Sequence, residues 1–140
     1  MRTKRFVEPP GTKPGGNFSQ GILLDGTLHI SGQPGEDAAG QISQNFEAEV
    51  TQALDNTGAV LKAAGMAGAD VVSAQVNVTD AALFQRMNSV YTKHFKDPRP
   101  TSTPAIVSRL VGAGHIEKTA NTRNSGSKGE KTCQKVLFIR

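Results

Sequence analysis

The 140-residue sequence has one cysteine, Cys133, a single tyrosine and no tryptophan. A lone cysteine can form neither an internal disulfide nor a cysteine-based metal site. The three histidines, His29, His94 and His115, also lack the short spacing of metal ligands. We therefore expect no structural cystine and no bound metal.

Long apolar runs are missing as well. No stretch approaches the roughly eighteen consecutive apolar residues of a membrane-spanning helix, and the first five residues lead into no apolar signal region. A chain of 140 residues is long enough for one hydrophobic core and too short for two comfortable ones. The sequence predicts one soluble, cytoplasmic domain that does not contact a membrane.

The net charge of +4 belongs to the end of the chain rather than to its body. Residues 1–120 carry 11 Lys or Arg and 11 Asp or Glu, whereas residues 121–140 carry five and one. Nucleic-acid-binding domains usually combine a basic stripe with aromatic side chains for stacking. Here the charges are scattered and aromatic residues are only 5% of the chain, which argues against nucleic acid as the partner.

Turn residues and periodicity divide the first half of the chain. Residues 1–15 form a Pro- and Gly-rich lead-in, which we expect to be extended or looping. Asp25-Gly26 lies between two apolar runs and predicts a hairpin of strands at about 19–24 and 27–32. From Ile42 onward apolar residues recur at helical spacing, and Gly65 is expected to end that helix.

The second half predicts a strand, a helix and two further strands. Apolar and polar residues alternate over 72–78, and Asp80 is expected to cap an amphipathic helix at 83–95. After a proline-rich stretch, strands are predicted at about 105–110 and 115–120, joined by the Gly-rich turn VGAG. The order β-β-α-β-α-β-β indicates an α+β domain with one sheet and both helices on one face.

The uncovered face of this sheet would be polar. Ser73, Gln75 and Asn77 alternate with the valines of the predicted strand at 72–78. Such a face is too polar for a core and suits a wet interface between subunits, so we expect the chain to oligomerise through it. Residues 123–140 read as a basic tail, either disordered or non-native.

Six motifs occur in order over residues 16–120: GNFSQG, HISGQ, ALDNTGAVLKAAG, DVVSAQVNVTD, FQRMNSVYTKHF and VSRL. Together they resemble the Rid family, the reactive-intermediate deaminases, whose members were often catalogued as perchloric-acid-soluble endoribonucleases. The resemblance implies a chorismate-mutase-like domain over residues 16–122, with one mixed sheet, assembled as a homotrimer with clefts between subunits. It also implies hydrolysis of enamines and imines, such as 2-aminoacrylate and 2-imino acids, to 2-keto acids and ammonia without a cofactor.

Arg109, in the motif VSRL, falls on the substrate-binding arginine of that family. A planar guanidinium can hold a carboxylate by two parallel hydrogen bonds, which lysine cannot reproduce. The alternative is that Arg109 is half of a surface ion pair.

The resemblance places further residues around the substrate. Phe18 stands where many relatives have tyrosine, and Ser31 and Gly32 would bring strand backbone close to the ligand. A β-bulge explains Ser31 and Gly32 equally well. Asn88 on the second helix either contributes to the cleft or faces water, and Ser108 adjoins Arg109.

The largest departure from the family pattern lies in HIEKTAN. Deaminating relatives typically read Glu-x-Glu on this strand, and the second Glu is thought to position or activate water; here the pair is Glu117 and Thr119. A threonine hydroxyl can hold a water but cannot take its proton at neutral pH. Glu117 points to the same side of the strand and could substitute only with a shift in register.

Three functions therefore remain open from the sequence. One is a deaminase in which Thr119 holds the attacking water. Another is a non-catalytic trimer that binds small carboxylates or a protein partner. The third, ribonuclease activity, is disfavoured by the neutral body of the chain and its few aromatic residues.

Overall fold

The computed structural model describes residues 3–12 and 16–123. The predicted tail beyond residue 123, with Cys133, lies outside the described residues. The strands are β1 (Lys4–Val7), β2 (Gly21–Leu24), β3 (Thr27–Pro34), β4 (Val71–Val78), β5 (Thr101–Ile106) and β6 (Ile116–Arg123). The helices are α1 (Phe46–Ala63) and α2 (Leu83–His94), and a short 3-10 helix, η1 (Gly68–Asp70), precedes β4.

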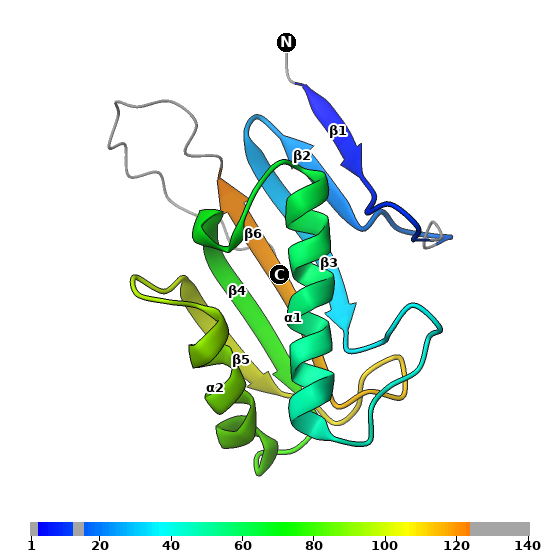
Figure 1. Cartoon of the computed structure of the whole chain (residues 1–140), viewed down its shortest axis with the longest axis vertical. Helices are drawn as coiled ribbons and strands as arrows, with labels where there is room; N and C mark the ends of the chain where they lie inside the picture. Colours follow the sequence, from blue (N-terminus) through cyan, green and yellow to red (C-terminus); the bar gives the residue numbers. More distant parts are fainter. Residues whose placement is uncertain (1–2, 13–15, 124–140) are drawn as a thin grey trace.

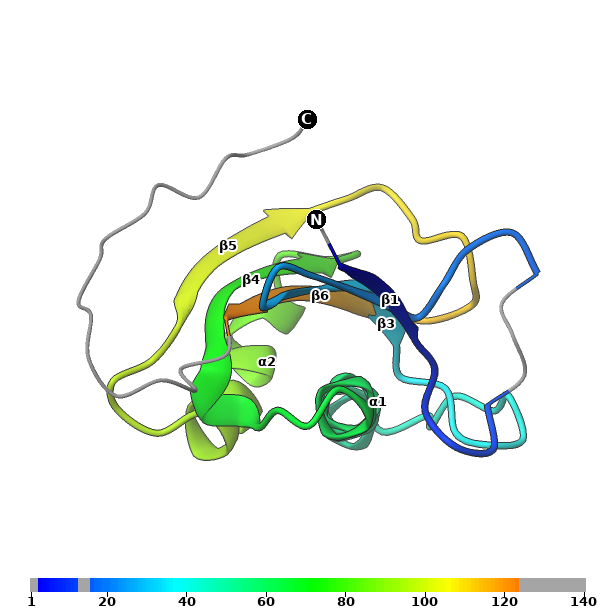
Figure 2. The ribbon, with the colours of Figure 1, turned by 90° about the horizontal axis from the view of Figure 1, so that it is seen from above.

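The strands form one mixed sheet in the order β1-β2-β3-β6-β4-β5, in which only the β4–β5 pair is parallel. Both helices pack on the same face of the sheet, and the opposite face carries neither helix (Figures 1 and 2). This architecture confirms the predicted α+β fold with two helices on one face. Within the described part of the chain, neither helix is long and apolar enough to cross a membrane.

The predicted hairpin is confirmed. Leu24 pairs with Thr27, and the two residues between them adopt left-handed backbone conformations, with φ of 49° at Asp25 and 78° at Gly26. Two-residue hairpin turns of this kind favour Asp-Gly because glycine meets no steric cost at positive φ. Strand β1 pairs with β2 and forms one edge of the sheet. Its four residues are too few for the sequence to show an alternation of apolar and polar side chains.

The helix predicted from Ile42 begins later, at Phe46. Asn45 caps it by accepting a 2.8 Å hydrogen bond from the backbone N–H of Ala48. Ile42 instead forms an isolated bridge with Glu36, so its apolar side chain falls on the helical period by coincidence. The helix ends before Gly65, whose φ of 76° is the left-handed conformation expected after a helix.

The strand predicted at 105–110 is wrong by about four residues. Strand β5 runs over Thr101–Ile106, parallel to β4 at the edge of the sheet, where Pro104 is tolerated because an edge strand is bonded on one side only. It does not pair with β6, because β4 lies between them. Arg109 consequently leaves the strand and lies in the connection between β5 and β6, which we call the 107–115 loop.

One buried charge stands out in the core between the sheet and the helices. Lys118 is 1% exposed, and it lies on the helix-facing side of β6 between buried Ile116 and Ala120. Its Nζ has no hydrogen-bond partner and lies 4.1 Å from the centroid of the Phe95 ring. Burial lowers the pKa of Lys118 to about 7, because the charged form loses its hydration.

Replacing Lys118 with methionine is predicted to stabilise the fold at neutral pH. The unfolded chain keeps this proton up to about pH 10.5 and the folded chain loses it near pH 7, so the folded state binds fewer protons in that window. The destabilising contribution of Lys118 is therefore complete below about pH 7 and disappears as the pH rises towards 10.5. The free energy of unfolding of Lys118→Met should therefore exceed that of wild type by a margin that falls as the pH rises. The fall is at most about 1.4 kcal/mol per pH unit.

Urea unfolding of both proteins between about pH 7 and 10 measures this difference. Lys93→Met, which removes an exposed lysine from α2, is the matched control. The interpretation is contradicted if Lys118→Met is less stable than wild type at pH 7, or if the difference is independent of pH.

Candidate functional site

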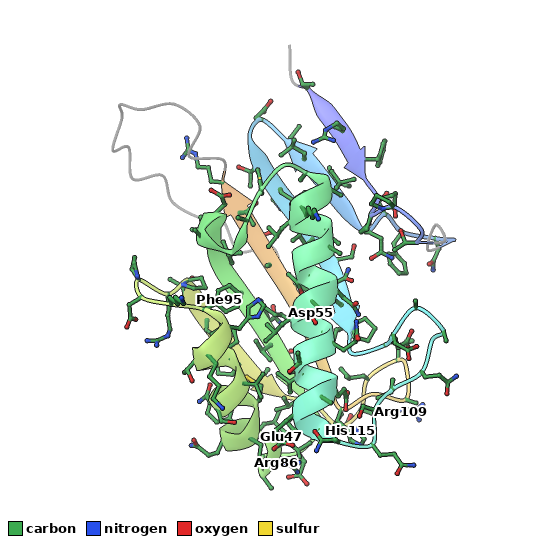
Figure 3. All side chains as sticks on the ribbon, viewed as in Figure 1. Glu47, Asp55, Arg86, Phe95, Arg109 and His115 are labelled. Atoms are coloured by element: carbon green, nitrogen blue, oxygen red, sulfur yellow. The ribbon has the colours of Figure 1, made fainter. Side chains whose placement is uncertain are left out.

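Arg109 is exposed in the 107–115 loop, at the end of the molecule where α1 begins (Figure 3). Within residues 3–12 and 16–123 its side chain makes no hydrogen bond and no ion pair. In the described chain no acidic side chain pairs with Arg109, so the alternative of an ion pair within one chain has no partner there. A guanidinium in this state is available to an anion from outside.

Ser31 and Gly32 form a β-bulge in β3. Opposite β6 the register changes between Ile30 and Gln33, which leaves these two residues unpaired in that ladder. The Ser31 hydroxyl donates to the Ser19 carbonyl at 2.6 Å, and the Ser31 N–H donates to the Gln20 carbonyl at 2.9 Å. The bulge thereby holds the loop that presents Phe18, whose side chain is 53% exposed.

The carboxyl group of Glu117 lies over Gly32. A Cβ atom added to Gly32 would lie 2.6 Å from both Cδ and Oε1 of Glu117, closer than side chains pack. Only glycine lets the β3 backbone approach this carboxyl group so closely. The structure thus brings Glu117 against Gly32, and the register shift at Ser31 and Gly32 is the β-bulge that the sequence left as an alternative to a substrate contact.

Thr119 lies one strand position further along the same face. On β6 the buried residues Ile116, Lys118 and Ala120 face the helices, so Glu117 and Thr119 face the bare side of the sheet. Thr119 is paired with Gln75 of β4. Its hydroxyl is therefore among the polar groups of the open face, beside the Gln75 and Asn77 side chains, which bond to each other at 3.3 Å.

Asn88 is not brought to this group within one chain. It lies on α2, which covers the face opposite to Glu117 and Thr119, and its backbone carbonyl accepts the Thr92 hydroxyl within the helix. Asn88 can therefore contribute to a cleft with these residues only if a second chain brings it there. Otherwise it faces water, which is the alternative given by the sequence. Ser108, next to Arg109, is exposed in the same loop.

One hollow in the described residues lies elsewhere. It measures about 420 Å³ and is lined by η1, the end of α2 and the following loop, including His94 and Phe95. None of the predicted site residues lines it. In the same described residues no three His, Cys, Asp or Glu side chains gather as a metal site.

Glu49 makes a contact with the 107–115 loop that the sequence does not reveal. It is fully buried in the first turn of α1 and accepts hydrogen bonds from the backbone of His115 and Ile116, where the 107–115 loop joins β6. In sequence, an acid in the first turn of a helix reads as a partner of the helix dipole. Nothing local indicates a contact with a segment 66 residues away.

One chain thus presents the Glu117 carboxyl group over Gly32 and the Thr119 hydroxyl on its open face, and the Arg109 guanidinium, unpaired in the described residues, in the 107–115 loop. The guanidinium can bind a carboxylate, and the other two groups can orient water or a polar group on the ligand. The hollow beside η1 and the end of α2 is not lined by any of these groups.

Comparisons with known proteins identify the family of the chain. The family model Endoribonuclease L-PSP matches residues 10–120. The 2-iminobutanoate/2-iminopropanoate deaminase of Bos taurus is 40% identical over 104 residues, which are 73% of this chain and 76% of that protein.

Solved structures match the whole fold. The crystal structure of RidA from the Antarctic bacterium Psychrobacter sp. PAMC 21119 has a TM-score of 0.80 and 28% identity, covering 85% of this chain and 98% of that one. E. coli TdcF with bound serine has a TM-score of 0.80 and 28% identity, covering 86% and 98%. The chain belongs to the Endoribonuclease L-PSP family, as its motif resemblance to the Rid deaminases indicated.

Proposed function

We propose that this protein hydrolyses 2-imino acids to 2-keto acids and ammonia. The observation that carries this proposal is Arg109, an exposed guanidinium without an acid partner in the described chain. The name of the bovine relative, a deaminase of 2-iminobutanoate and 2-iminopropanoate, supports the same chemistry. Both of those substrates carry a carboxylate that a guanidinium can bind.

In the proposed reaction Arg109 binds the carboxylate through two parallel hydrogen bonds. Backbone groups near Ser31 and Ser108 orient the imine, and Gly32 leaves room for the Glu117 carboxyl group beside the ligand. A water held by the Thr119 hydroxyl adds its oxygen to the imine carbon. The carbon–nitrogen bond then breaks, ammonia leaves with the protons of the water and the imine, and the 2-keto acid remains.

Orientation supplies most of the acceleration in this scheme. Positioning of a reactant and water can lower a barrier by several kcal/mol, about 7–11 in favourable intramolecular cases. General-base help, which Thr119 cannot give, is typically worth about a hundredfold or more. We therefore expect a slower enzyme than a relative with a glutamate at this position.

A homotrimer is the proposed assembly. In the proposed trimer a neighbouring copy lies over the polar open face and supplies the second wall of the cleft. Asn88, on the other side of its own sheet, would reach a cleft only from a neighbouring copy.

The second candidate function is a binder of small carboxylates without turnover. Thr119, in place of the expected glutamate, is the observation that favours it. Arg109 keeps its role in this alternative, so carboxylate binding is common to both candidates and turnover separates them.

Arg109→Ala should lower kcat/KM for 2-iminopropanoate by about a hundredfold, because two charge-assisted hydrogen bonds are lost. Arg109→Lys should restore only part of this loss, since an ammonium lacks the planar fork. An amino-acid oxidase generates the imine in place, and its decay is followed with and without protein. Arg99→Ala, which removes a partly exposed arginine paired with Asp97, is the control.

If the imine decays no faster with wild type or with Arg109→Ala than in buffer alone, the proposed deaminase function is wrong. Saturable binding of 2-oxobutanoate by wild type without turnover would then establish the second candidate.

Thr119→Glu should raise kcat, by up to about a hundredfold, because it supplies a proton acceptor beside the attacking water. Thr119→Val, which keeps the shape and removes the hydroxyl, should lower kcat. Thr103→Val is a matched control, because Thr103 flanks Gln75 from β5 as Thr119 does from β6. Equal kcat values for Thr119→Val and wild type would show that Thr119 holds no catalytic water.

A further inference from the structure

We propose that Glu49 is a positioning residue that fixes the 107–115 loop so that Arg109 faces the carboxylate of the substrate. The inference rests on the proposed function for its substrate, and on the geometry of the loop for everything else. Glu49 lies on α1 and acts through the loop rather than by touching the ligand.

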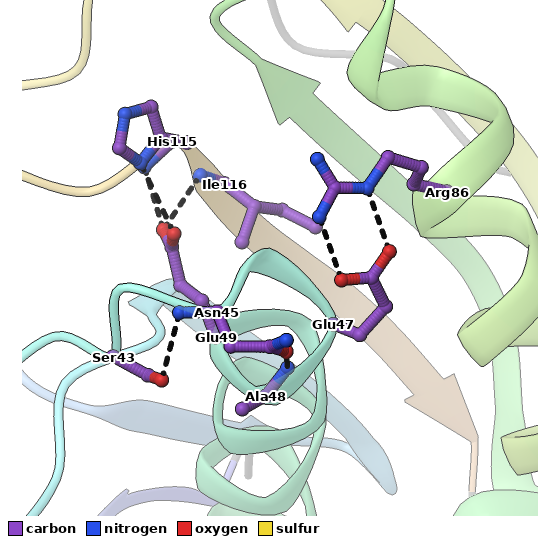
Figure 4. Close-up of polar contacts among 8 residues, drawn as sticks. All are labelled: Ser43, Asn45, Glu47, Ala48, Glu49, Arg86, His115 and Ile116. Carbon is purple, nitrogen blue, oxygen red and sulfur yellow. Dashed lines mark hydrogen bonds and ion pairs between the residues drawn. The ribbon is translucent and has the colours of Figure 1, made fainter.

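The contacts of Glu49 converge on one end of the loop (Figure 4). Its Oε1 accepts the His115 N–H at 2.6 Å and the Ile116 N–H at 3.1 Å. Its Oε2 lies 3.2 Å from His115 Nδ1, the distance at which a protonated Nδ1 donates. Glu49 is 0% exposed, so water cannot replace it as the acceptor.

The backbone is shaped around this side chain. A Cβ on Gly114 would lie 2.9 Å from Glu49 Oε1 and 3.3 Å from Ile42 Cδ1. A Cβ on Gly35 would collide with the carbonyl oxygen and Cγ of Glu49. Two glycines from different loops thus leave room for one acid, which is more than a helix-capping residue requires.

The loop depends on its two ends. Val107 N–H donates to the Val78 carbonyl at 2.9 Å, and Thr79 N–H donates to the His115 carbonyl at 3.1 Å. Between these ties, residues 108–113 make no hydrogen bond within the described chain. The direction of Arg109 is therefore set by where the loop starts and ends, and Glu49 fixes the second of these points.

The same face of α1 also holds the other side of the proposed site. Asn56, two turns after Glu49, donates from Nδ2 to the carbonyls of Pro34 and Glu36 at 2.8 Å each. These carbonyls follow the β3 bulge that contains Gly32. Helix α1 thus holds both the end of β3, through Asn56, and the 107–115 loop, through Glu49. Only the Glu49 contact acts on the loop that contains Arg109.

Glu47 offers a matched control on the same helix turn. It forms a two-pronged ion pair with Arg86 of α2, at 2.6 and 2.7 Å (Figure 4). This pair joins the two helices and makes no contact with the 107–115 loop. Loss of Glu47 therefore perturbs the start of α1 without releasing Arg109.

The experiment compares wild type with Glu49→Gln, Glu49→Leu, Gly114→Ala and Glu47→Leu in the full chain. Glu49→Gln keeps an oxygen that accepts from both backbone N–H groups. Glu49→Leu removes every acceptor, and Gly114→Ala displaces the carboxyl group by a few tenths of an ångström in case the leucine variant does not fold. The readouts are the Kd of 2-oxobutanoate by NMR titration, KM and kcat for 2-iminopropanoate, and amide exchange of residues 107–116.

Misplacement of the carboxylate-binding group by about 1 Å should raise Kd and KM about tenfold or more in Glu49→Leu, and by less in Gly114→Ala, with smaller changes in kcat. Glu49→Gln and Glu47→Leu should stay near wild type. Unchanged Kd and KM in a folded Glu49→Leu or Gly114→Ala protein overturn the inference, as does an equal effect of Glu47→Leu.

Failure of the proposed function gives a different pattern. If wild type neither binds 2-oxobutanoate nor hydrolyses the imine, the proposed function is wrong and the exchange data decide the role of Glu49. Faster exchange over residues 107–116 in Glu49→Leu or Gly114→Ala, but not in Glu47→Leu, supports loop positioning. Equal exchange in all variants rejects it.

Discussion

In the described residues the two helices cover one face of the sheet only (Figures 1 and 2), and the proposed site depends on that constraint. The core lies between the sheet and the two helices, where alternate residues of β4 and β6 are buried. The residues between these buried positions must then face the open side of the sheet. Among them are Gln75, Glu117 and Thr119. A polar sheet face with no helix over it is stable in water, and it carries Glu117 and Thr119 of the proposed site.

Buried polar residues fix the parts of the site that the core itself does not. Glu49 is fully buried yet satisfied by three nitrogen atoms, so its removal leaves backbone donors without partners. Lys118 is equally buried and has only the face of an aromatic ring beside it. Glu49 ties the end of the 107–115 loop to α1. Lys118 is predicted to weaken the fold at neutral pH and has no role in the proposed site.

Local signals predicted much of the fold. Asp25-Gly26 specifies its turn whatever surrounds it, and Gly65 ends α1 because few other residues adopt its backbone conformation. The glycine in HISGQ indicated either a β-bulge or a close approach to a ligand, and the structure shows the bulge, with the Glu117 carboxyl group over Gly32. Arg109 was found through the motif VSRL, although its loop was read as a strand.

The remaining features depend on contacts between distant segments, which no local pattern contains. Strand β5 was misplaced because Pro104 reads as a strand breaker, and only its position at the sheet edge makes it acceptable. From the sequence alone, Lys118 between Glu117 and Thr119 would be taken for a surface residue. It is buried because the pairing of β6 directs its side chain towards the helices. Glu49 gave no signal because its partners lie 66 and 67 residues away.

The central claim is that Arg109 binds a small carboxylate in a cleft closed by another copy of the chain. A crystal structure of the protein soaked with 2-oxobutanoate tests it most directly. We predict a carboxylate held by both prongs of the Arg109 guanidinium, beside Gly32 and Thr119, with a neighbouring copy over the open sheet face. A guanidinium paired with an acid of another copy, or one that points into solvent away from any subunit junction, would contradict the claim.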